Sequence, residues 1–164
     1  MISKIIFLFV TLFGIGKIKK IPGSVASLAT TIFLFFLLHI LGISPNIILF
    51  SVIIIFFLSL YAVKIFIKNL DNKDPKEIVI DEFIGQSIPI CLYEIAHEVS
   101  KETSQVLTSY FIMFILFRIF DIVKPYPVSY YDKNFKNSFG VIMDDVAAGL
   151  YVVAVLVLYM VFTS

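Results

Sequence analysis

The sequence predicts an all-α polytopic membrane protein with about five transmembrane helices and a short N-terminal helix that is interfacial or re-entrant. Two observations support this fold class. Hydrophobic residues make up 60% of the 164 residues and charged residues only 15%, and the mean hydropathy of +1.00 lies far above that of soluble domains. One soluble core of this size could not hide so much apolar surface, so lipid must cover much of it. We expect residues 1–164 to form a single membrane-embedded domain.

Four apolar runs approach the length that a bilayer-spanning helix needs, which is about twenty mainly apolar residues. These runs are Val25–Leu41, Ile47–Ile67, Val106–Val123 and Val141–Phe162. Upstream of them, the apolar run Ile5–Phe13 is too short to cross a membrane and suits an interfacial or re-entrant helix. We therefore expect four spanning helices preceded by one short helix.

A fifth apolar run, Phe83–Ala96, is shorter and contains Gln86 and Pro89. Taken alone, it fits a kinked span, a half-helix or a buried re-entrant segment. The basic residues decide between these alternatives, because positively charged loops stay on the cytoplasmic side. The lysines before the first span and those after the second lie on the same side of the membrane. Arg118 and Lys124 lie on that side only if the fifth run crosses the membrane. A crossing is therefore favoured.

Several classes of function are excluded by what the sequence lacks. Basic residues do not cluster among aromatic residues, so nucleic acid is not expected as a partner. Cys91 is the single cysteine, which rules out an intrachain disulfide and a multi-cysteine metal site. The chain also has no P-loop, no G-x-S-x-G nucleophile motif and no cysteine-dependent phosphatase loop.

The acidic residues fall into clusters that this topology brings to one membrane face. Asp81 and Glu82 open the third span, Asp121 closes the fourth, and Asp144 and Asp145 open the fifth. Placing a carboxylate at membrane depth costs free energy. Several carboxylates that face one point therefore indicate a common function, such as holding a divalent cation. Magnesium prefers these hard oxygen ligands, and both histidines fall in the far half of the protein, which argues against zinc. The alternative is that the carboxylates only cap helix N-termini.

Cationic side chains lie next to these carboxylates in the segment Arg118–Pro125. Arg118 and Asp121 share one helical face, and Lys124 lies partly round the helix before the proline ends it. The forked donors of Arg118 and the point charge of Lys124 suit phosphate oxygens and the charge of phosphoryl transfer. The alternative is a structural Arg118–Asp121 ion pair with ordinary basic anchoring near the lipid headgroups.

The loop before the first span, Gly14–Ser27, is rich in small and turn-forming residues. Such a loop can present backbone N–H groups at a helix N-terminus to an anion, with the hydroxyl of Ser24 or Ser27 assisting. The alternative interpretation is a turn followed by an ordinary helix cap.

Taken together, these residues resemble the bacterial phosphatidylglycerophosphatase A family of membrane enzymes. The resemblance covers nearly the whole chain and rests on four blocks: Gly14–Leu28, Asp81–Gly85, Arg118–Pro127 and Gly140–Gly149. The last two blocks are the most specific, because their residue types and spacing both match. The chain departs from the family pattern at Ser24, Ala26 and Ile80, where that pattern resembles threonine, glycine and often tryptophan.

The resemblance implies Mg²⁺-dependent hydrolysis of phosphatidylglycerol phosphate to phosphatidylglycerol and inorganic phosphate, the last step in making that lipid. It further implies a multi-pass protein of the bacterial inner membrane with its active site facing the cytoplasm. The expected magnesium ligands are Glu82, Asp144 and Asp145, assisted by Asp81 or Asp121. The expected phosphate-binding residues are Arg118, Lys124, Ser24 and Ser27.

Two other classes of function stay open. A different lipid headgroup phosphatase, or a phosphotransferase that joins two substrates, would use the same carboxylates. A small non-enzymatic transporter or structural membrane protein would instead use the acidic pairs for ion coupling or helix association, and it would release no phosphate.

Overall fold

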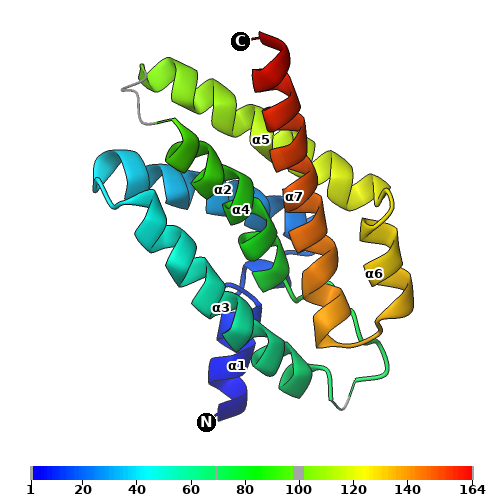
Figure 1. The fold of residues 1–164 in the computed structure, drawn as a ribbon. Helices are drawn as coiled ribbons and strands as arrows, with labels where there is room; N and C mark the ends of the chain where they lie inside the picture. Colours follow the sequence, from blue (N-terminus) through cyan, green and yellow to red (C-terminus); the bar gives the residue numbers. More distant parts are fainter. Residues whose placement is uncertain (1, 69, 98–101, 164) are drawn as a thin grey trace.

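A computed structural model describes residues 2–68, 70–97 and 102–163, and every regular element within these ranges is a helix. In chain order the elements are α1 (Ile2–Val10), η1 (Ile15–Lys17), α2 (Pro22–Phe35), η2 (Phe36–Ile40), α3 (Pro45–Phe66), α4 (Ile80–Ala96), α5 (Thr103–Val123), α6 (Val128–Asn134) and α7 (Ser138–Thr163). Figure 1 shows the long helices packed around α4, with the two termini at opposite ends of the bundle.

Four of the helical segments are long and apolar enough to cross a membrane. They are Pro22–Ile40, which joins α2 to the π-helical turn η2, Pro45–Phe66, Thr103–Val123 and Ser138–Phe162. Each coincides with one of the four runs that the sequence predicts, with ends displaced by a few residues. The prediction of an all-helical membrane protein is therefore confirmed, and α1 is the short N-terminal helix that it includes.

The fifth predicted run forms α4, which begins at Ile80 rather than Phe83 and lies at the centre of the bundle. It packs against α2, α3, α5 and α7, and nine of its 17 residues are buried. At 1.5 Å per residue its length is about 26 Å, slightly short of a bilayer core. Protein rather than lipid surrounds α4, so Gln86 and Pro89, which are both buried, lie away from lipid.

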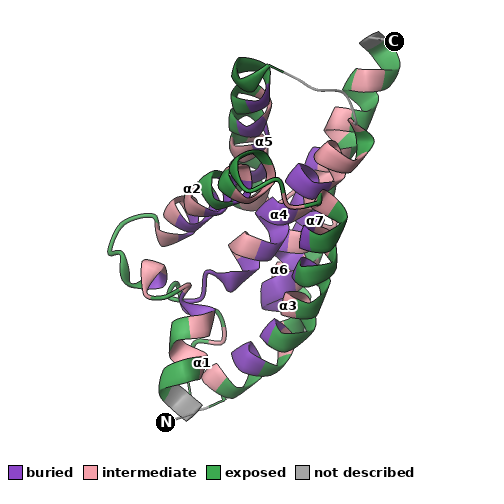
Figure 2. Cartoon of the chain, turned by 90° about the vertical axis from the view of Figure 1, so that its left-hand side faces the viewer, coloured by how far each residue is buried: buried purple, intermediate pink, exposed green. Residues whose placement is uncertain are grey.

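Large apolar side chains cover the outer faces of the long helices. Phe50 and Phe57 on α3, Phe111 on α5 and Phe162 on α7 are each more than 60% exposed, and Figure 2 shows exposed residues along the outer faces of α3, α5 and α7. Such a surface would be unfavourable in water, so these faces contact lipid. The chain is a membrane protein.

Glycines set the distance between α4 and α7. A Cβ atom on Gly149 would overlap the carbonyl oxygen of Gly85, and a Cβ atom on Gly85 would lie 2.6 Å from the carbonyl oxygen of Asp145. Side chains at either position would therefore push the two backbones apart. This close approach places the start of α7, with its two aspartates, beside the first turn of α4.

The segment after α5 folds back against α7. Lys124 ends α5 in the left-handed region (φ 48°), which turns the chain before α6. The Tyr151 hydroxyl on α7 donates a hydrogen bond to the carbonyl oxygen of Tyr126, and the Tyr151 ring stacks on Phe120 with ring centres 5.0 Å apart. These contacts fasten the end of α5 and the loop before α6 to the middle of α7, and α6 itself packs against α7.

Candidate active site

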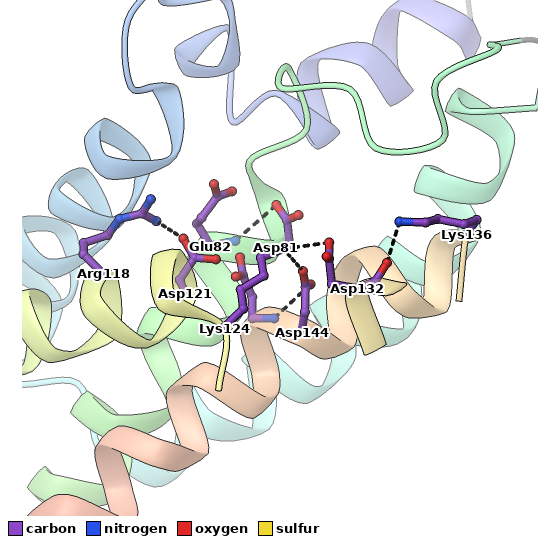
Figure 3. Close-up of polar contacts among 9 residues, drawn as sticks. Asp81, Glu82, Arg118, Asp121, Lys124, Asp132, Lys136 and Asp144 are labelled. Carbon is purple, nitrogen blue, oxygen red and sulfur yellow. Dashed lines mark hydrogen bonds and ion pairs between the residues drawn. The ribbon is translucent and has the colours of Figure 1, made fainter. Parts of the chain in front are cut away.

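Three carboxylates meet where the first turn of α4 crosses α7. Each of Asp81, Glu82 and Asp145 offers one oxygen that lies within 4.8 Å of the other two. Figure 3 shows Asp81 and Glu82 at the start of α4, next to the side chains contributed by α5 and α7. Only 7% of Asp81 and 3% of Asp145 is exposed. Carboxylates this close repel one another when they are ionised, and a bound cation would relieve that repulsion.

Asp144 belongs to a neighbouring charge network instead. Its carboxylate accepts a hydrogen bond of 2.8 Å from the Lys124 ammonium, which donates a second bond of 2.8 Å to Asp132 on α6. Burial alone would lower the pKa of Lys124, but these hydrogen bonds outweigh it and raise the pKa above the usual value. The same contact with Lys124 lowers the pKa of Asp132. Lys124 is therefore a fixed positive charge at the edge of the carboxylate cluster.

Arg118 supplies the second fixed cation. Its Nη1 donates to Asp121, at 2.9 Å, and to the hydroxyl of Ser27 on α2, at 3.3 Å. Its Nε is buried and has no hydrogen-bond partner among the described residues. The contacts of Nη1 hold the guanidinium against α2, and the free Nε leaves donor capacity for a ligand.

Gly23 brings the N-terminus of α2 against the carboxylate cluster. A Cβ atom at this position would overlap Glu82 Oε1, and it would lie 3.0 Å from the Glu82 carboxyl carbon and 3.4 Å from Arg118 Nη1. Ser27 donates its hydroxyl hydrogen to the carbonyl oxygen of Gly23, at 2.9 Å. The small-residue loop that the sequence analysis singled out thus forms one wall of the site.

These groups enclose a cavity of about 400 Å³. Its polar and charged lining consists of Lys19, Ser24, Asp74, Lys76, Asp81, Glu82, Arg118, Asp121, Lys124, Asp144 and Asp145. The structure therefore brings together, around one cavity, all the site residues that the sequence suggested except Ser27. Ser27 lies behind Arg118 and contacts it instead.

The charges around this cavity fit a divalent cation. Four cationic side chains and six carboxylates line it, which leaves a formal charge of −2. A phosphate monoester itself carries about −1.5 to −2 charges at neutral pH, so it would be repelled without a counter-charge. Glu82 Oε2 is buried and unpartnered among the described residues, and the available ligands are all hard oxygens. Both properties suit Mg²⁺.

Comparison with known proteins decides the family. Residues 8–160 match the family model described as Phosphatidylglycerophosphatase A. The chain belongs to the phosphatidylglycerophosphatase A family. The resemblance inferred from the sequence motifs is thereby confirmed, and the protein is an enzyme of the phosphoric monoester hydrolase class.

Two relatives carry the family's name. The chain is 36% identical to phosphatidylglycerophosphatase A of Haemophilus influenzae over 143 residues, covering 87% of this chain and 81% of that protein. It is 29% identical to phosphatidylglycerophosphatase A of Escherichia coli over 140 residues, covering 84% and 73%. A putative phosphatidylinositol-3-phosphatase of Bacteroides thetaiotaomicron is 40% identical over 80 residues, covering 49% of this chain and 45% of that protein. No solved structure matches this chain.

Within this phosphatidylglycerophosphatase A family member, the carboxylate grouping differs in one respect from the expected one. The sequence analysis grouped Asp144 with Glu82 and Asp145, whereas the structure groups Asp81 with those two residues and pairs Asp144 with Lys124. Asp132 lies on α6 and shares the Lys124 ammonium with Asp144.

Some residues at the site were not predicted to be there. Asp74 and Lys76 line the cavity from the loop before α4, and no local pattern distinguishes them from other loop charges. Gln86, one helical turn after Glu82, does not line the cavity, but it is fully buried with both polar side-chain atoms unpartnered among the described residues. In the sequence, Gln86 stands out only as a polar residue within an apolar run.

Proposed function

We propose that this protein hydrolyses the phosphomonoester of phosphatidylglycerol phosphate, in a Mg²⁺-dependent reaction that yields phosphatidylglycerol and inorganic phosphate. Membership of the phosphatidylglycerophosphatase A family supports the choice of substrate. The observation that carries the chemistry is the cluster of Asp81, Glu82 and Asp145 in one cavity with Arg118 and Lys124. Carboxylates that can hold a cation, next to cations that can hold phosphate, are the parts that phosphoryl transfer requires.

Asp81, Glu82 and Asp145 would hold the magnesium ion, with Asp144 and Asp121 close by. When bound, the ion would polarise the phosphoryl group and lower the pKa of a coordinated water. The geometry favours Asp81 over Asp144 as a direct ligand, because Asp144 already accepts a hydrogen bond from Lys124. Asp144 would then act by fixing the position of that ammonium.

Arg118 and Lys124 would bind the phosphate oxygens and stabilise the charge that develops during transfer. Each is oriented by carboxylates on its own side of the cavity: Arg118 by Asp121, and Lys124 by Asp132 and Asp144. Preorganised cations of this kind need no rearrangement as the reaction proceeds, which is the main source of electrostatic catalysis. Ser24, at the N-terminus of α2, would add a hydroxyl donor on the opposite wall.

We further propose that the site faces the cytoplasm from the bacterial inner membrane. The cavity is lined by the loops before α2 and α4 together with residues of α2, α4, α5 and α7, and the loop before α4 lies in the same half of the bundle as α1 and α6 (Figure 1). The loops at this end carry Lys19, Lys20, Lys73 and Lys76, and α6 carries Lys133, whereas the turn 41–44 at the other end has no charged residue. The positive-inside rule supports this orientation.

The test is phosphate release by the purified, detergent-solubilised protein. Phosphatidylglycerol phosphate would be compared with phosphatidic acid, lysophosphatidic acid and phosphatidylinositol 3-phosphate, each with Mg²⁺ or with EDTA. The last lipid is included because a relative is named for it. We expect Mg²⁺-dependent release from phosphatidylglycerol phosphate at least tenfold faster than from the others. Equal release from all four lipids would overturn the substrate assignment. No release from folded protein would overturn the proposal that the protein hydrolyses the phosphomonoester.

A further inference from the structure

A second cavity, of about 470 Å³, adjoins the carboxylate site. It is lined by Phe7, Gly16, Lys17, Ile18, Lys19, Pro22, Lys76 and Glu77. Lys19, Pro22 and Lys76 line both cavities, so the two lie side by side. We call this second space the basic cavity.

The fold holds the two walls of the basic cavity together through main-chain contacts. The Val79 N–H donates to the carbonyl oxygen of Val10 at 3.0 Å, which ties the end of α1 to the segment before α4. A Cβ atom on Gly16 would overlap the carbonyl oxygen of Glu77, so the loop after α1 lies directly on that segment. Two basic stretches about sixty residues apart in the sequence therefore face the same space.

Lysines predominate among the charged residues of the basic cavity. Three lysines and one glutamate line it, and two of these lysines, Lys19 and Lys76, also line the carboxylate cavity. The Lys17 ammonium lies 4.6 Å from the centre of the Phe7 ring. The ammonium groups of Lys19 and Lys76 have no ion pair or hydrogen bond within the described part of the chain. These lysines can therefore bind an anion without a metal ion.

The chemistry of the proposed substrate supplies such an anion. Phosphatidylglycerol phosphate carries a terminal phosphomonoester and, one glycerol away, a phosphodiester that joins this glycerol to the diacylglycerol. Phosphatidic acid has only the monoester. An enzyme that distinguishes these lipids has to contact a group that one of them lacks, and a site built for a group penalises the lipid without it.

We propose that Lys17, Lys19 and Lys76 bind the bridging phosphodiester of the substrate while its terminal phosphomonoester occupies the carboxylate cavity. This inference rests on the proposed function and adds the basis of its specificity. The apolar residues Phe7 and Ile18, on the same cavity wall, would lie toward the diacylglycerol part of the lipid.

The first test compares two double variants in micelles of a neutral detergent. Lys17→Gln/Lys76→Gln removes two charges from the basic cavity, and Lys64→Gln/Lys68→Gln removes two exposed charges from the end of α3. Because a lysine near a lipid anion contributes modestly at an exposed site, we expect the first variant to raise KM for phosphatidylglycerol phosphate about tenfold. The control should keep the wild-type KM. An unchanged KM in the first variant would overturn the proposal.

The second test does not require turnover. Phosphatidylglycerol contains the phosphodiester but no monoester, so its equilibrium binding to the protein in neutral micelles reports on the phosphodiester contact without a contribution from the phosphomonoester. We expect it to bind Lys17→Gln/Lys76→Gln about tenfold more weakly than the wild type, and to inhibit the wild type competitively. Equal binding, or inhibition that is not competitive, would assign the lysines to general lipid anchoring and overturn the proposal. Absence of phosphate release from the wild type would contradict the proposed function, while this binding comparison would still decide the present inference.

Discussion

Gly23 on α2 and Glu82 on α4 lie so close that a Cβ atom on residue 23 would overlap the Glu82 Oε1 atom. The contact joins the start of the first spanning helix to the cluster of carboxylates. It explains why a small-residue loop precedes α2: the backbone itself forms part of the cavity wall. A residue larger than glycine would have to displace the Glu82 carboxylate.

Gly23→Ala is therefore expected to reduce activity more than stability. The atom that the new methyl group meets is the end of a flexible side chain, so Glu82 can rotate away at little cost to the fold. Once displaced, Glu82 no longer lies with Asp81 and Asp145. We expect phosphate release to fall at least tenfold while the midpoint of thermal unfolding in detergent changes little. A normal rate in this variant would show that the position of Glu82 is unimportant.

Gly149→Val is expected to reduce the stability of the fold, which Gly23→Ala leaves nearly unchanged. Its side chain would meet the backbone carbonyl of Gly85 rather than a flexible group, and overpacking of this kind costs about 1–3 kcal/mol. The thermal midpoint should fall clearly. Ala154→Val is the matched control, because Ala154 is exposed on the same helix. Similar midpoints for the two variants would contradict the close α4–α7 crossing.

The membrane helices could be predicted because their signal is local. Four runs of about twenty apolar residues leave little choice of structure, and all four appear with small shifts at their ends. The fifth, α4, was less certain because a central helix surrounded by protein can be short and can carry Gln86 and Pro89. The prediction that it crosses the membrane rests on the distribution of basic residues along the chain.

The detailed grouping of the carboxylates could not be predicted. Adjacent residues on a helix point about 100° apart, so Asp144 and Asp145 cannot both face α4. The choice between them depends on the rotation of α7, which the Gly85 and Gly149 contact sets. Likewise, Asp74 reaches the cavity from a loop whose path no periodic pattern describes.

Loss of Lys124 is expected to lower activity more than loss of Lys136, although both lysines bind Asp132. Lys124 bridges the carboxylates of Asp132 and Asp144, each at 2.8 Å, whereas Lys136 donates to the main-chain oxygen of Asp132 at 2.6 Å. Lys124→Ala should lower kcat/KM for phosphatidylglycerol phosphate about a hundredfold, because a preorganised cation is lost. Lys136→Ala should stay within about twofold. Equal losses would indicate that surface charge alone explains the effect.

Arg118→Lys tests whether the guanidinium geometry matters beyond its charge. Arg118 contacts Asp121 and Ser27 through one nitrogen and keeps Nε free, an arrangement that an ammonium cannot reproduce. We expect kcat/KM to fall about tenfold or more, with Mg²⁺ affinity unchanged in a titration of activity against metal. Retention of the full rate would show that any cation at this position is sufficient.

The most direct test of the proposed catalytic centre is the rate of Mg²⁺-dependent phosphate release by Asp145→Asn in proteoliposomes containing phosphatidylglycerol phosphate. Asp145 is almost fully buried in the three-carboxylate cluster, and the substitution removes its charge while keeping its shape. Asp71→Asn, at an exposed loop position, is the control. We expect release by Asp145→Asn to be lost while its insertion and folding match the wild type, with Asp71→Asn fully active. A folded Asp145→Asn protein with the wild-type rate would contradict the assignment of this cluster as the catalytic centre.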